Sequence, residues 1–579
     1  MGFARQLGTS GAFIPETPFE LSMSRCNAVP MRSFFSPPQK IALAVLFALF
    51  SVQVFTIMHD KSATADAIGH HTVNGYVYLK THDYRMNPAM PPLLRQWMAL
   101  PWLLIKPVLD LDKPSWHEAD PVPFAVDFFY KDNRDLASTL LMSSQIMMFL
   151  LSLVMAWAVV LWAKRLYGPS AALFALSLFV FCPTILGYSA LANVDNGLAL
   201  FYFLTVYSLY RWSEGDKRFP WMVALFLGLV LASKYTGILL LPVVLFYFLL
   251  KRGWVRGSVV FLAVLFLSLG IVWASYFFEV KPLLQNVPRL EEKVNYIGKI
   301  SDFLTFGNPD ARDFLIRQAK ALPIPLSSWI LGLAGIVRSH RSEYGHFFMG
   351  EWIHEGVWYH YLLSFLLKTT IAFLVLIGWR AATLLRRVEC ARSDHGFLVL
   401  PVLVIIFATF FDSTGVGIRY LVPIYPFLFV WVSGLWPRDD RHRKRWAGAL
   451  VGVLMFHIVS SLGQLPDHLQ YFNGLIGGPR NAYRYFRAND LEWGQEHKNL
   501  ARYAARHGIT DMRYKLFAAY DTSYYGIPGE PTTEEDVAAP GNFIYAISVY
   551  YLESFKWTQG VEPDHRIGNV IFIYDFRES

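Results

Sequence analysis

The chain contains repeated blocks of about 20 apolar residues, the length of helix that crosses the hydrocarbon core of a bilayer. Of its 579 residues, 54% are hydrophobic and only 17% are charged, which excludes a soluble enzyme. We therefore predict an α-helical polytopic membrane protein. Hydropathy predicts about eleven transmembrane helices, near residues 41–58, 138–163, 169–187, 194–210, 220–233, 237–250, 257–277, 358–379, 394–411, 418–436 and 446–464.

Basic residues are concentrated in alternate short loops between these segments. Lys and Arg occur near 164–165, 211–218, 251–256, 380–392 and 438–445, whereas the short loops 188–193 and 412–417 contain none. By the positive-inside rule, the basic loops and the N-terminus are cytoplasmic, and an odd number of crossings places the C-terminal segment outside. The net charge of +8 thus reflects orientation in the membrane and predicts no nucleic-acid partner.

Three parts of the chain follow from this pattern. We expect a cytoplasmic tail over 1–40, a transmembrane domain over 41–464 with long outer loops at 59–137 and 278–357, and an extracytoplasmic domain over 465–579. The last part has a helical pattern near 496–507 and alternating patterns at 542–551 and 567–576, which predict a small α/β domain.

The first outer loop contains a candidate general base. Asp66 and His70 are four residues apart, so a helix would place them on one face, where a carboxylate beside an imidazole can deprotonate a hydroxyl. A solvated acid beside two ordinary histidines, His70 and His71, explains the spacing as well. Asp195 opens an apolar segment, where an acid usually faces a partner, an ion or a polar cavity. A helix-capping role for Asp195 is the alternative.

Two cations are expected at the same outer face. The planar guanidinium of Arg419 suits phosphate oxygens. Lys234 can hold an anionic headgroup, although snorkelling of its side chain to the outer headgroups explains its position nearly as well. His346, Glu351 and His354 come from the second long loop and, with His71 from the first, are candidate substrate contacts. Carboxylates and cations at one leaflet suit a reaction in which a lipid phosphate leaves and an acceptor hydroxyl loses its proton.

Several segments, taken in order, resemble one known family. They are Gly75-Tyr76-Val77-Tyr78-Leu79-Lys80-Thr81, Asn87-Pro88, Pro91-Pro92-Leu93, Ser233-Lys234-Tyr235-Thr236-Gly237, Phe348-Met349-Gly350-Glu351, Trp358-Tyr359-His360-Tyr361, Lys368-Thr369, Arg419-Tyr420-Leu421-Val422-Pro423-Ile424-Tyr425-Pro426, Tyr471-Phe472-Asn473, Gly477-Gly478-Pro479, Glu492-Trp493-Gly494-Gln495-Glu496 and Tyr524-Tyr525-Gly526. Together they resemble the lipid-phosphate-sugar-dependent membrane glycosyltransferases of the protein O-mannosyltransferase superfamily, glycosyltransferase family 39, whose fold is called GT-C.

The resemblance implies an inverting glycosyltransferase of the cytoplasmic (inner) membrane. Its donor would be a polyprenyl-phosphate-linked sugar, and its acceptor a hydroxyl of a protein, lipid or glycan outside the cytoplasm. In the family an Asp-Glu pair followed three residues later by His carries the base. Here Asp66 and His70 match, but Ala67 replaces the Glu; alignment on His71 would instead place Ala67 at the base position. The family's Asp-Trp-Gly-Gln-Asp pattern becomes Glu492 to Glu496, which is expected to keep both negative charges.

These expectations assign roles to individual residues and leave alternatives open. Asp66 is the expected base, Lys234 and Arg419 steady the lipid phosphate, and Asp195 helps to hold the acceptor, the donor phosphate or a cation. No cofactor is certain, and a divalent metal on Asp66, His70, His71 and Asp195 is possible. A transporter or flippase for a lipid-linked or anionic solute is one alternative. A catalytically inactive, glycan-binding relative, suggested by Ala67, is the other.

Overall fold

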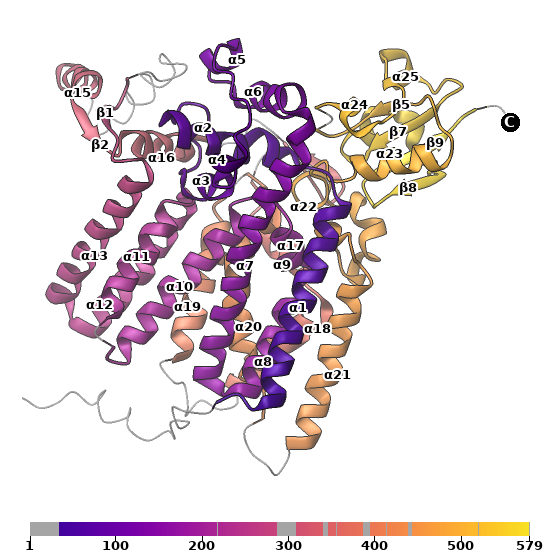
Figure 1. Cartoon of the computed structure of the whole chain (residues 1–579). Helices are drawn as coiled ribbons and strands as arrows, with labels where there is room; N and C mark the ends of the chain where they lie inside the picture. The colour runs from indigo at the N-terminus through magenta and orange to yellow at the C-terminus, as the bar shows by residue number, and fades with distance from the viewer. Residues whose placement is uncertain are drawn as a thin grey trace, which may run out of the picture.

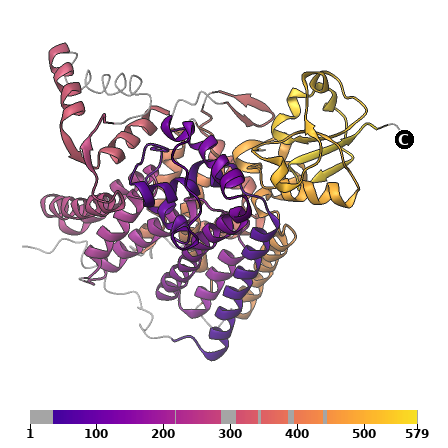
Figure 2. The same cartoon turned by 45° about the horizontal axis from the view of Figure 1, so that its top comes forward.

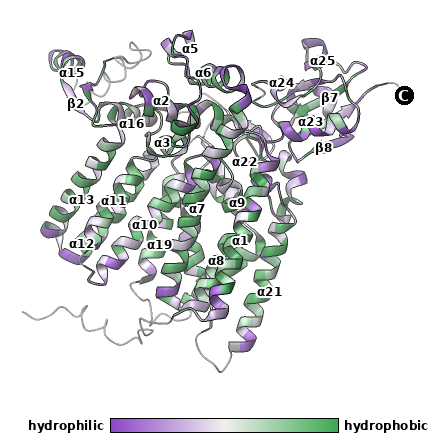
Figure 3. Cartoon of the chain, in the orientation of Figure 1, coloured by the Kyte–Doolittle hydropathy of each residue, from purple (hydrophilic) through white to green (hydrophobic). Residues whose placement is uncertain are grey.

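In the computed structural model, apolar helices stand side by side in a bundle, and the hydrophilic segments gather at one end of it (Figures 1 and 3). The structure describes residues 34–216, 218–285, 308–339, 345–354, 356–385, 394–412, 414–437, 443–518 and 520–577. Most of the tail expected over 1–40 lies outside these residues. Seen from the hydrophilic end, the C-terminal domain lies to one side of the bundle (Figure 2).

Within the described residues, five helices are long and apolar enough to cross a membrane: α1 (Pro37–Asp60), Arg134–Tyr167 including α7 (Ala137–Tyr167), Tyr235–Arg252 including η4 (Tyr235–Leu240) and α12 (Leu241–Arg252), α13 (Trp254–Ser275), and Lys444–Leu462 within α21 (Arg443–Leu462). Two further pairs qualify together but are bent, α8 (Pro169–Val180) with α9 (Pro183–Ser189) by 64° and α17 (His360–Lys368) with α18 (Ile371–Leu385) by 111°. The remaining helices of the bundle are α10 (Asp195–Ser213), α11 (Phe219–Leu231), α19 (Asp394–Thr409), η6 (Gly417–Ile424) and α20 (Tyr425–Ser433). Every segment expected from hydropathy thus contains helix, while the number of crossings stays a prediction.

The two bends have different causes. Pro183 begins α9, and because its ring clashes with the preceding turn and it has no N–H to donate, it favours the break after α8. The break between α17 and α18 has no proline; instead Asn473 donates from its side-chain amide to the carbonyls of Leu366 (2.6 Å) and Thr369 (2.9 Å). The end of α17 is therefore satisfied by a residue about a hundred positions away, which no local pattern could indicate.

The apolar block over 220–250 forms two helical segments, α11 and η4 with α12, joined by a short turn. The turn is stabilised from outside: the indole N–H of Trp329 donates to the carbonyl of Leu231 (3.1 Å), and the amide of Leu93 donates to that of Ala232 (3.2 Å). Lys234 lies directly after this turn, at a fixed place at the hydrophilic end of the bundle.

The first outer loop is mostly short helices: η1 (Ala67–Thr72), α2 (Val73–Thr81), α3 (Leu93–Ala99), α4 (Trp102–Ile105), α5 (Pro114–His117), α6 (Pro121–Asp127), η2 (Phe128–Asp132) and η3 (Arg134–Leu136). Arg95 on α3 is fully buried and donates to the Tyr78 hydroxyl (3.0 Å) and to the Asn87 carbonyl (2.8 Å). Gly75 on α2 allows this packing, because a Cβ there would lie 2.0 Å from the Arg95 carbonyl oxygen. The loop is thus a packed cap over the bundle.

The second outer loop contains one pair of strands distant in sequence, one hairpin and two helices among its described residues: β1 (Val280–Pro282), α15 (Pro309–Ala321), β2 (Pro323–Pro325), α16 (Ser327–Ser339), β3 (His346–Phe348) and β4 (Glu351–Ile353). The strands pair antiparallel, β1 with β2 and β3 with β4. An isolated bridge between Phe348 and Phe486 joins the β3–β4 hairpin to the C-terminal domain.

The C-terminal domain is mixed α/β. Its elements are η7 (His468–Gln470), η8 (Gly474–Ile476), η9 (Pro479–Arg484), α22 (Ala488–Leu491), α23 (His497–Arg506), β5 (Arg513–Lys515), α24 (Thr522–Tyr525), β6 (Glu530–Pro531), α25 (Glu534–Ala538), β7 (Ile544–Ser548), η10 (Val549–Ser554), η11 (Lys556–Thr558), β8 (His565–Ile567) and β9 (Ile571–Asp575). The strand order is β6-β5-β7-β9-β8; β5 runs parallel to β6 and β7, and β9 runs antiparallel to β7 and β8. The expected fold class, an α-helical membrane protein with a small α/β domain at its C-terminal end, is confirmed.

Candidate active site

Two ion pairs bring together the four charged residues singled out at the outer face. A guanidinium nitrogen of Arg419 lies 2.8 Å from a carboxylate oxygen of Asp66, and the Lys234 ammonium lies 2.7 Å from Asp195. All four residues stand where helices begin: Asp66 directly before η1, Asp195 at the first residue of α10, Lys234 directly before η4 and Arg419 near the start of η6. Helix ends at one side of the bundle thus supply both acids and both cations.

The two pairs are neighbours. The Lys234 ammonium lies 4.8 Å from the ring centroid of Tyr420, the residue after Arg419. Arg419 is within electrostatic reach of Asp195 as well as Asp66. The convergence expected from the sequence is therefore present in the geometry, with each acid held by a particular cation.

Exposure distinguishes the two pairs. The side chains of Asp66 and Arg419 retain 25% and 17% of their accessible surface, whereas those of Asp195 and Lys234 retain 4% and 9%. Asp66 and Arg419 are therefore partly open to solvent, whereas the Asp195–Lys234 pair is buried.

The start of η6, which presents Arg419, is fixed by a buried acid from α22. The Ile418 amide donates to Asp490 (2.8 Å), and the Ser364 hydroxyl donates to the other carboxylate oxygen (2.9 Å). Gly417 has φ +78°, and a Cβ there would lie 2.6 Å from Asp490, so only glycine fits this close approach. The close approach of Asp490, from the C-terminal part of the chain, thus explains why glycine occupies position 417.

Residues 67–72 form a π-helix rather than an α-helix, which bears on the two histidines after Asp66. A π-turn spans five residues, so both His70 and His71 act electrostatically on Asp66. Burial lowers the pKa of His70 and lowers that of His71 to about 3, so both imidazoles are neutral at pH 7. His70 Nδ1 lies 3.3 Å from the side-chain amide of Asn87.

Burial raises the pKa of the Asp66 carboxyl, but the positive charge of Arg419 and the hydrogen bond that it donates lower this pKa, and the net shift is downward. The resulting pKa is below its ordinary value, so Asp66 is an ionised carboxylate at neutral pH. A carboxylate in this state can accept a proton.

The three candidates from the second outer loop lie apart from this centre. His346 on β3 is buried, with its ring 5.0 Å from that of His360, and burial followed by His360 lowers its pKa to about 4. Glu351 and His354 are exposed. Among the described residues, no hydrogen bond or ion pair joins these three to the two pairs. Their role in substrate binding stays a prediction.

The described residues contain no group of three or more His, Cys, Asp or Glu side chains arranged to hold a metal ion. Asp66 and Asp195 each face a basic side chain instead. The set Asp66, His70, His71 and Asp195 therefore does not fit a divalent cation in this arrangement, and no step is derived through one.

Trp493 was not recognised as part of the site from the sequence. Its ring lies 5.3 Å from the Arg419 guanidinium carbon, and its side chain is buried. The signal was present in the Glu492–Glu496 segment, but nothing local relates an aromatic residue there to an arginine far away in the sequence. Burial raises the pKa of Glu492 to about 8, which disfavours the negative charge expected at this residue near neutral pH.

Comparisons with known proteins agree with the resemblance. Residues 122–276, which include Asp195 and Lys234, match the family model described as dolichyl-phosphate-mannose-protein mannosyltransferase. A comparison with curated protein sequences found no match.

Solved structures of two proteins are also similar. ArnT from Cupriavidus metallidurans in the apo state has 11% identity and a TM-score of 0.31, covering 93% of this chain and 98% of ArnT. The same protein bound to undecaprenyl phosphate has 11% identity and a TM-score of 0.29, covering 92% and 97%. The Archaeoglobus fulgidus oligosaccharyltransferase tethered to an acceptor peptide has 10% identity and a TM-score of 0.40, covering 85% of this chain and 63% of that one. The chain is thus similar over residues 122–276 to the dolichyl-phosphate-mannose-protein mannosyltransferases.

Proposed function

We propose that the protein transfers a sugar from a polyprenyl-phosphate-linked donor to a hydroxyl acceptor at the outer face of the membrane. The observation that carries this proposal is the Asp66–Arg419 pair: an ionised, partly exposed carboxylate 2.8 Å from a guanidinium. The match to a mannosyltransferase family over residues 122–276 supports the reaction class.

The proposed reaction is a single displacement. Asp66 takes the proton of the acceptor hydroxyl, the acceptor oxygen forms a bond to the anomeric carbon, and the bond from that carbon to the phosphate oxygen breaks. The electron pair leaves with the lipid phosphate. Attack from the face opposite the leaving group inverts the anomeric carbon.

Arg419 suits the departing phosphate because its donors are not all used. One terminal nitrogen holds Asp66, while the buried Nε has no hydrogen-bond partner among the described residues. An unpartnered buried donor is costly, and a phosphate oxygen would satisfy it. Lys234 contributes positive charge from behind, held by Asp195. Asp195 in this proposal orients Lys234 and has no direct part in proton transfer.

The embedded location of the site follows from the donor. A polyprenyl chain stays in the bilayer, so its phosphate reaches only groups at the ends of the apolar helices, where Lys234 and Arg419 lie. We place the site at the extracytoplasmic face of the cytoplasmic membrane, opposite the basic loops. The acceptor is a hydroxyl of a protein, lipid or glycan at that face.

The test is sugar transfer by purified protein in liposomes. Labelled polyprenyl-phosphate hexose and pentose serve as donors, extracted envelope material serves as acceptor, and released lipid phosphate is counted together with labelled product. Asp66→Asn should lower transfer by about 10²- to 10⁴-fold, the usual contribution of a general base. Asp83→Asn is a matched control, because Asp83 lies in the same loop with 26% exposure and pairs with Arg85.

The same assay separates the alternatives. A transporter or flippase would move the labelled donor between leaflets without forming a product, and Asp66→Asn would leave that movement unchanged. An inactive glycan-binding relative would retain labelled glycan and release no lipid phosphate. The contact of Asp66 with Arg419, beside Lys234, favours the enzyme over the inactive relative, because it keeps the candidate base next to two cations that suit a phosphate.

A further inference from the structure

The short loop that leads into Asp66 is held by the C-terminal domain. The Ser62 amide donates to the Gln495 carbonyl (2.9 Å), and the Ala65 amide donates to the Trp493 carbonyl (2.9 Å). The Ser62 hydroxyl in turn accepts from the Lys498 amide (2.8 Å). The residue before the candidate base is therefore fixed by main-chain bonds to a segment more than 400 positions away.

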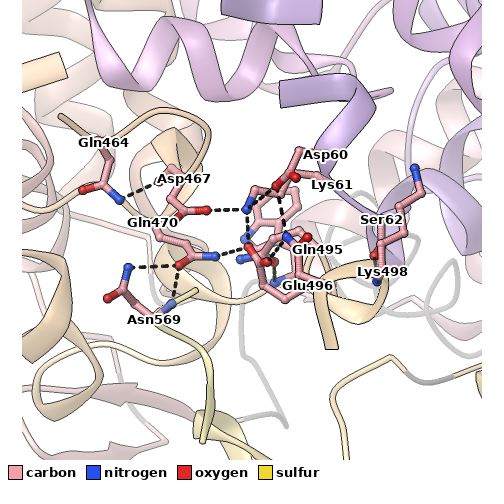
Figure 4. Close-up of polar contacts among 12 residues, drawn as sticks. Asp60, Lys61, Ser62, Gln464, Asp467, Gln470, Gln495, Glu496, Lys498 and Asn569 are labelled. Carbon is pink, nitrogen blue, oxygen red and sulfur yellow. Dashed lines mark hydrogen bonds and ion pairs between the residues drawn. The ribbon is translucent and has the colours of Figure 1, made fainter. Parts of the chain in front are cut away.

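The beginning of this loop is anchored by buried charges (Figure 4). Lys61 is 7% exposed; its ammonium lies 2.7 Å from Glu496 and also contacts Asp467. Asp60, at the end of α1, accepts from Arg502 (2.8 Å). Removing one partner of the buried Lys61–Glu496 pair would leave an uncompensated charge, so this pair favours one docking of the domain on α1.

Trp493 contacts both sides of the Asp66–Arg419 pair. Its carbonyl binds the amide next to Asp66, and its indole lies against the Arg419 guanidinium at 5.3 Å. The side chain is 4% exposed, and its other side meets the ring of Tyr188 edge-on at 6.0 Å. Such cation–π contacts orient a guanidinium as well as attract it.

The local geometry keeps Trp493 in place. The Trp493 amide donates to the side-chain oxygen of Gln495 (2.6 Å), whose amide group donates back to the Leu491 carbonyl (3.0 Å). Gly494 has φ +82°, a conformation that favours glycine. The Trp-Gly-Gln sequence thus forms a closed turn that presents one carbonyl and one ring to the site.

We propose that Trp493 is a positioning residue through which the C-terminal α/β domain sets the geometry of the Asp66–Arg419 pair. Trp493 touches neither reacting atom, and its effect passes through Ala65 and Arg419. This proposal rests on the proposed function for its kinetic consequences, but its structural consequence, the ordering of residues 61–72, does not.

Three variants test it in the full-length protein. Trp493→Leu removes the aromatic face, Trp493→Phe keeps an aromatic face, and Trp557→Leu is a matched control inside the C-terminal domain. Trp557 packs against Tyr545 at 5.2 Å and Phe576 at 5.3 Å and donates to the Asp536 carbonyl (2.9 Å). Trp557→Leu should therefore loosen the packing of the C-terminal domain without removing any contact to Arg419.

Trp493→Leu should lower kcat for sugar transfer by about 10- to 30-fold, with the KM for the polyprenyl-phosphate donor within about 3-fold of wild type. Trp493→Phe should recover most of this loss. Hydrogen–deuterium exchange over residues 61–72 should quicken in Trp493→Leu, because without the packed ring the turn at 493–495 moves more, and the Ser62 and Ala65 amides that bond to its carbonyls open more often. Trp557→Leu should lower the Tm but leave kcat and this exchange unchanged.

Unchanged kcat and unchanged exchange over 61–72 in Trp493→Leu would overturn the proposal. So would a Trp557→Leu variant that matches Trp493→Leu in both readouts, because the effect would then be general loosening of the domain. If wild-type protein transfers no sugar, the proposed function fails, and the exchange experiment alone still decides whether Trp493 orders the Asp66 loop.

Discussion

The two ion pairs of the site have the same chemistry but different surroundings. Asp66 and Arg419 keep 25% and 17% of their side-chain surface, whereas Asp195 and Lys234 keep 4% and 9%. Burying an ion pair costs desolvation free energy that the attraction only partly returns, and removing one member leaves a charge without compensation. The difference suggests separate roles. The partly exposed Asp66–Arg419 pair can contact substrates, while the buried Asp195–Lys234 pair mainly stabilises the fold around the site and adds positive charge to it.

Neutralising each acid in turn should separate these roles most clearly. Asp66→Asn is expected to lower kcat by about 10²- to 10⁴-fold, and to change the free energy of unfolding by no more than about 1 kcal/mol because the pair is partly solvated. The measurements are sugar transfer and thermal unfolding in detergent. If Asp66→Asn and Asp83→Asn both transfer sugar as fast as the wild type, Asp66 is not the base.

The buried pair should behave in the opposite way. Asp195→Asn or Lys234→Met alone is expected to cost about 3–5 kcal/mol in the free energy of unfolding, because each leaves a buried charge unpaired. The double variant should recover most of that loss, since neither charge remains. Double-variant cycles on thermal unfolding measure the coupling between the two residues. Additive losses in the double variant would mean that the two side chains do not depend on each other.

Much of the fold could be predicted because hydropathy is a local property of the sequence. Each apolar block contains helix, and the strands predicted near 542–551 and 567–576 appear as β7 and β9. The bend between α17 and α18 could not be predicted, because its freed carbonyls are satisfied by Asn473 from a distant segment. Long-range hydrogen bonds leave no periodic pattern in the sequence.

The site was predicted as a set of residues but not as a set of partners. Charged residues at the ends of apolar helices are expected at a membrane face, and this rule was enough to group Asp66, Asp195, Lys234 and Arg419. Which acid pairs with which cation depends on how helices rotate and pack, and this information is spread over the whole bundle. Trp493 was missed for the same reason, because its link to Arg419 exists only once the C-terminal domain has docked.

Replacing Arg419 by lysine asks whether the exposed pair needs a planar fork or only a positive charge. Arg419→Lys keeps the charge but loses the second donor direction and the stacking on Trp493, so the KM for the lipid donor should rise by about 10-fold. Arg134→Lys is a matched control, because Arg134 pairs with Asp521 in an exposed salt bridge. Equal KM values for Arg419→Lys and wild type would show that charge alone is sufficient.

The smallest expected effect is on pH dependence. The base works when deprotonated, and the charge of Arg419 holds the pKa of Asp66 below its ordinary value of 3.8 despite burial, so activity should persist on the acidic side. The pKa of His71 is about 3 and that of His70 lies below its ordinary value, so neither imidazole titrates above pH 7, and kcat/KM should vary by less than about 2-fold from about pH 7 to 8. In Arg419→Gln, burial acts without the opposing charge, the pKa of Asp66 rises, and the acidic limb of kcat/KM should move to higher pH. An acidic limb near neutral pH in the wild type, unmoved in Arg419→Gln, would show that a group other than Asp66 governs the reaction and would end the contrast between the two pairs.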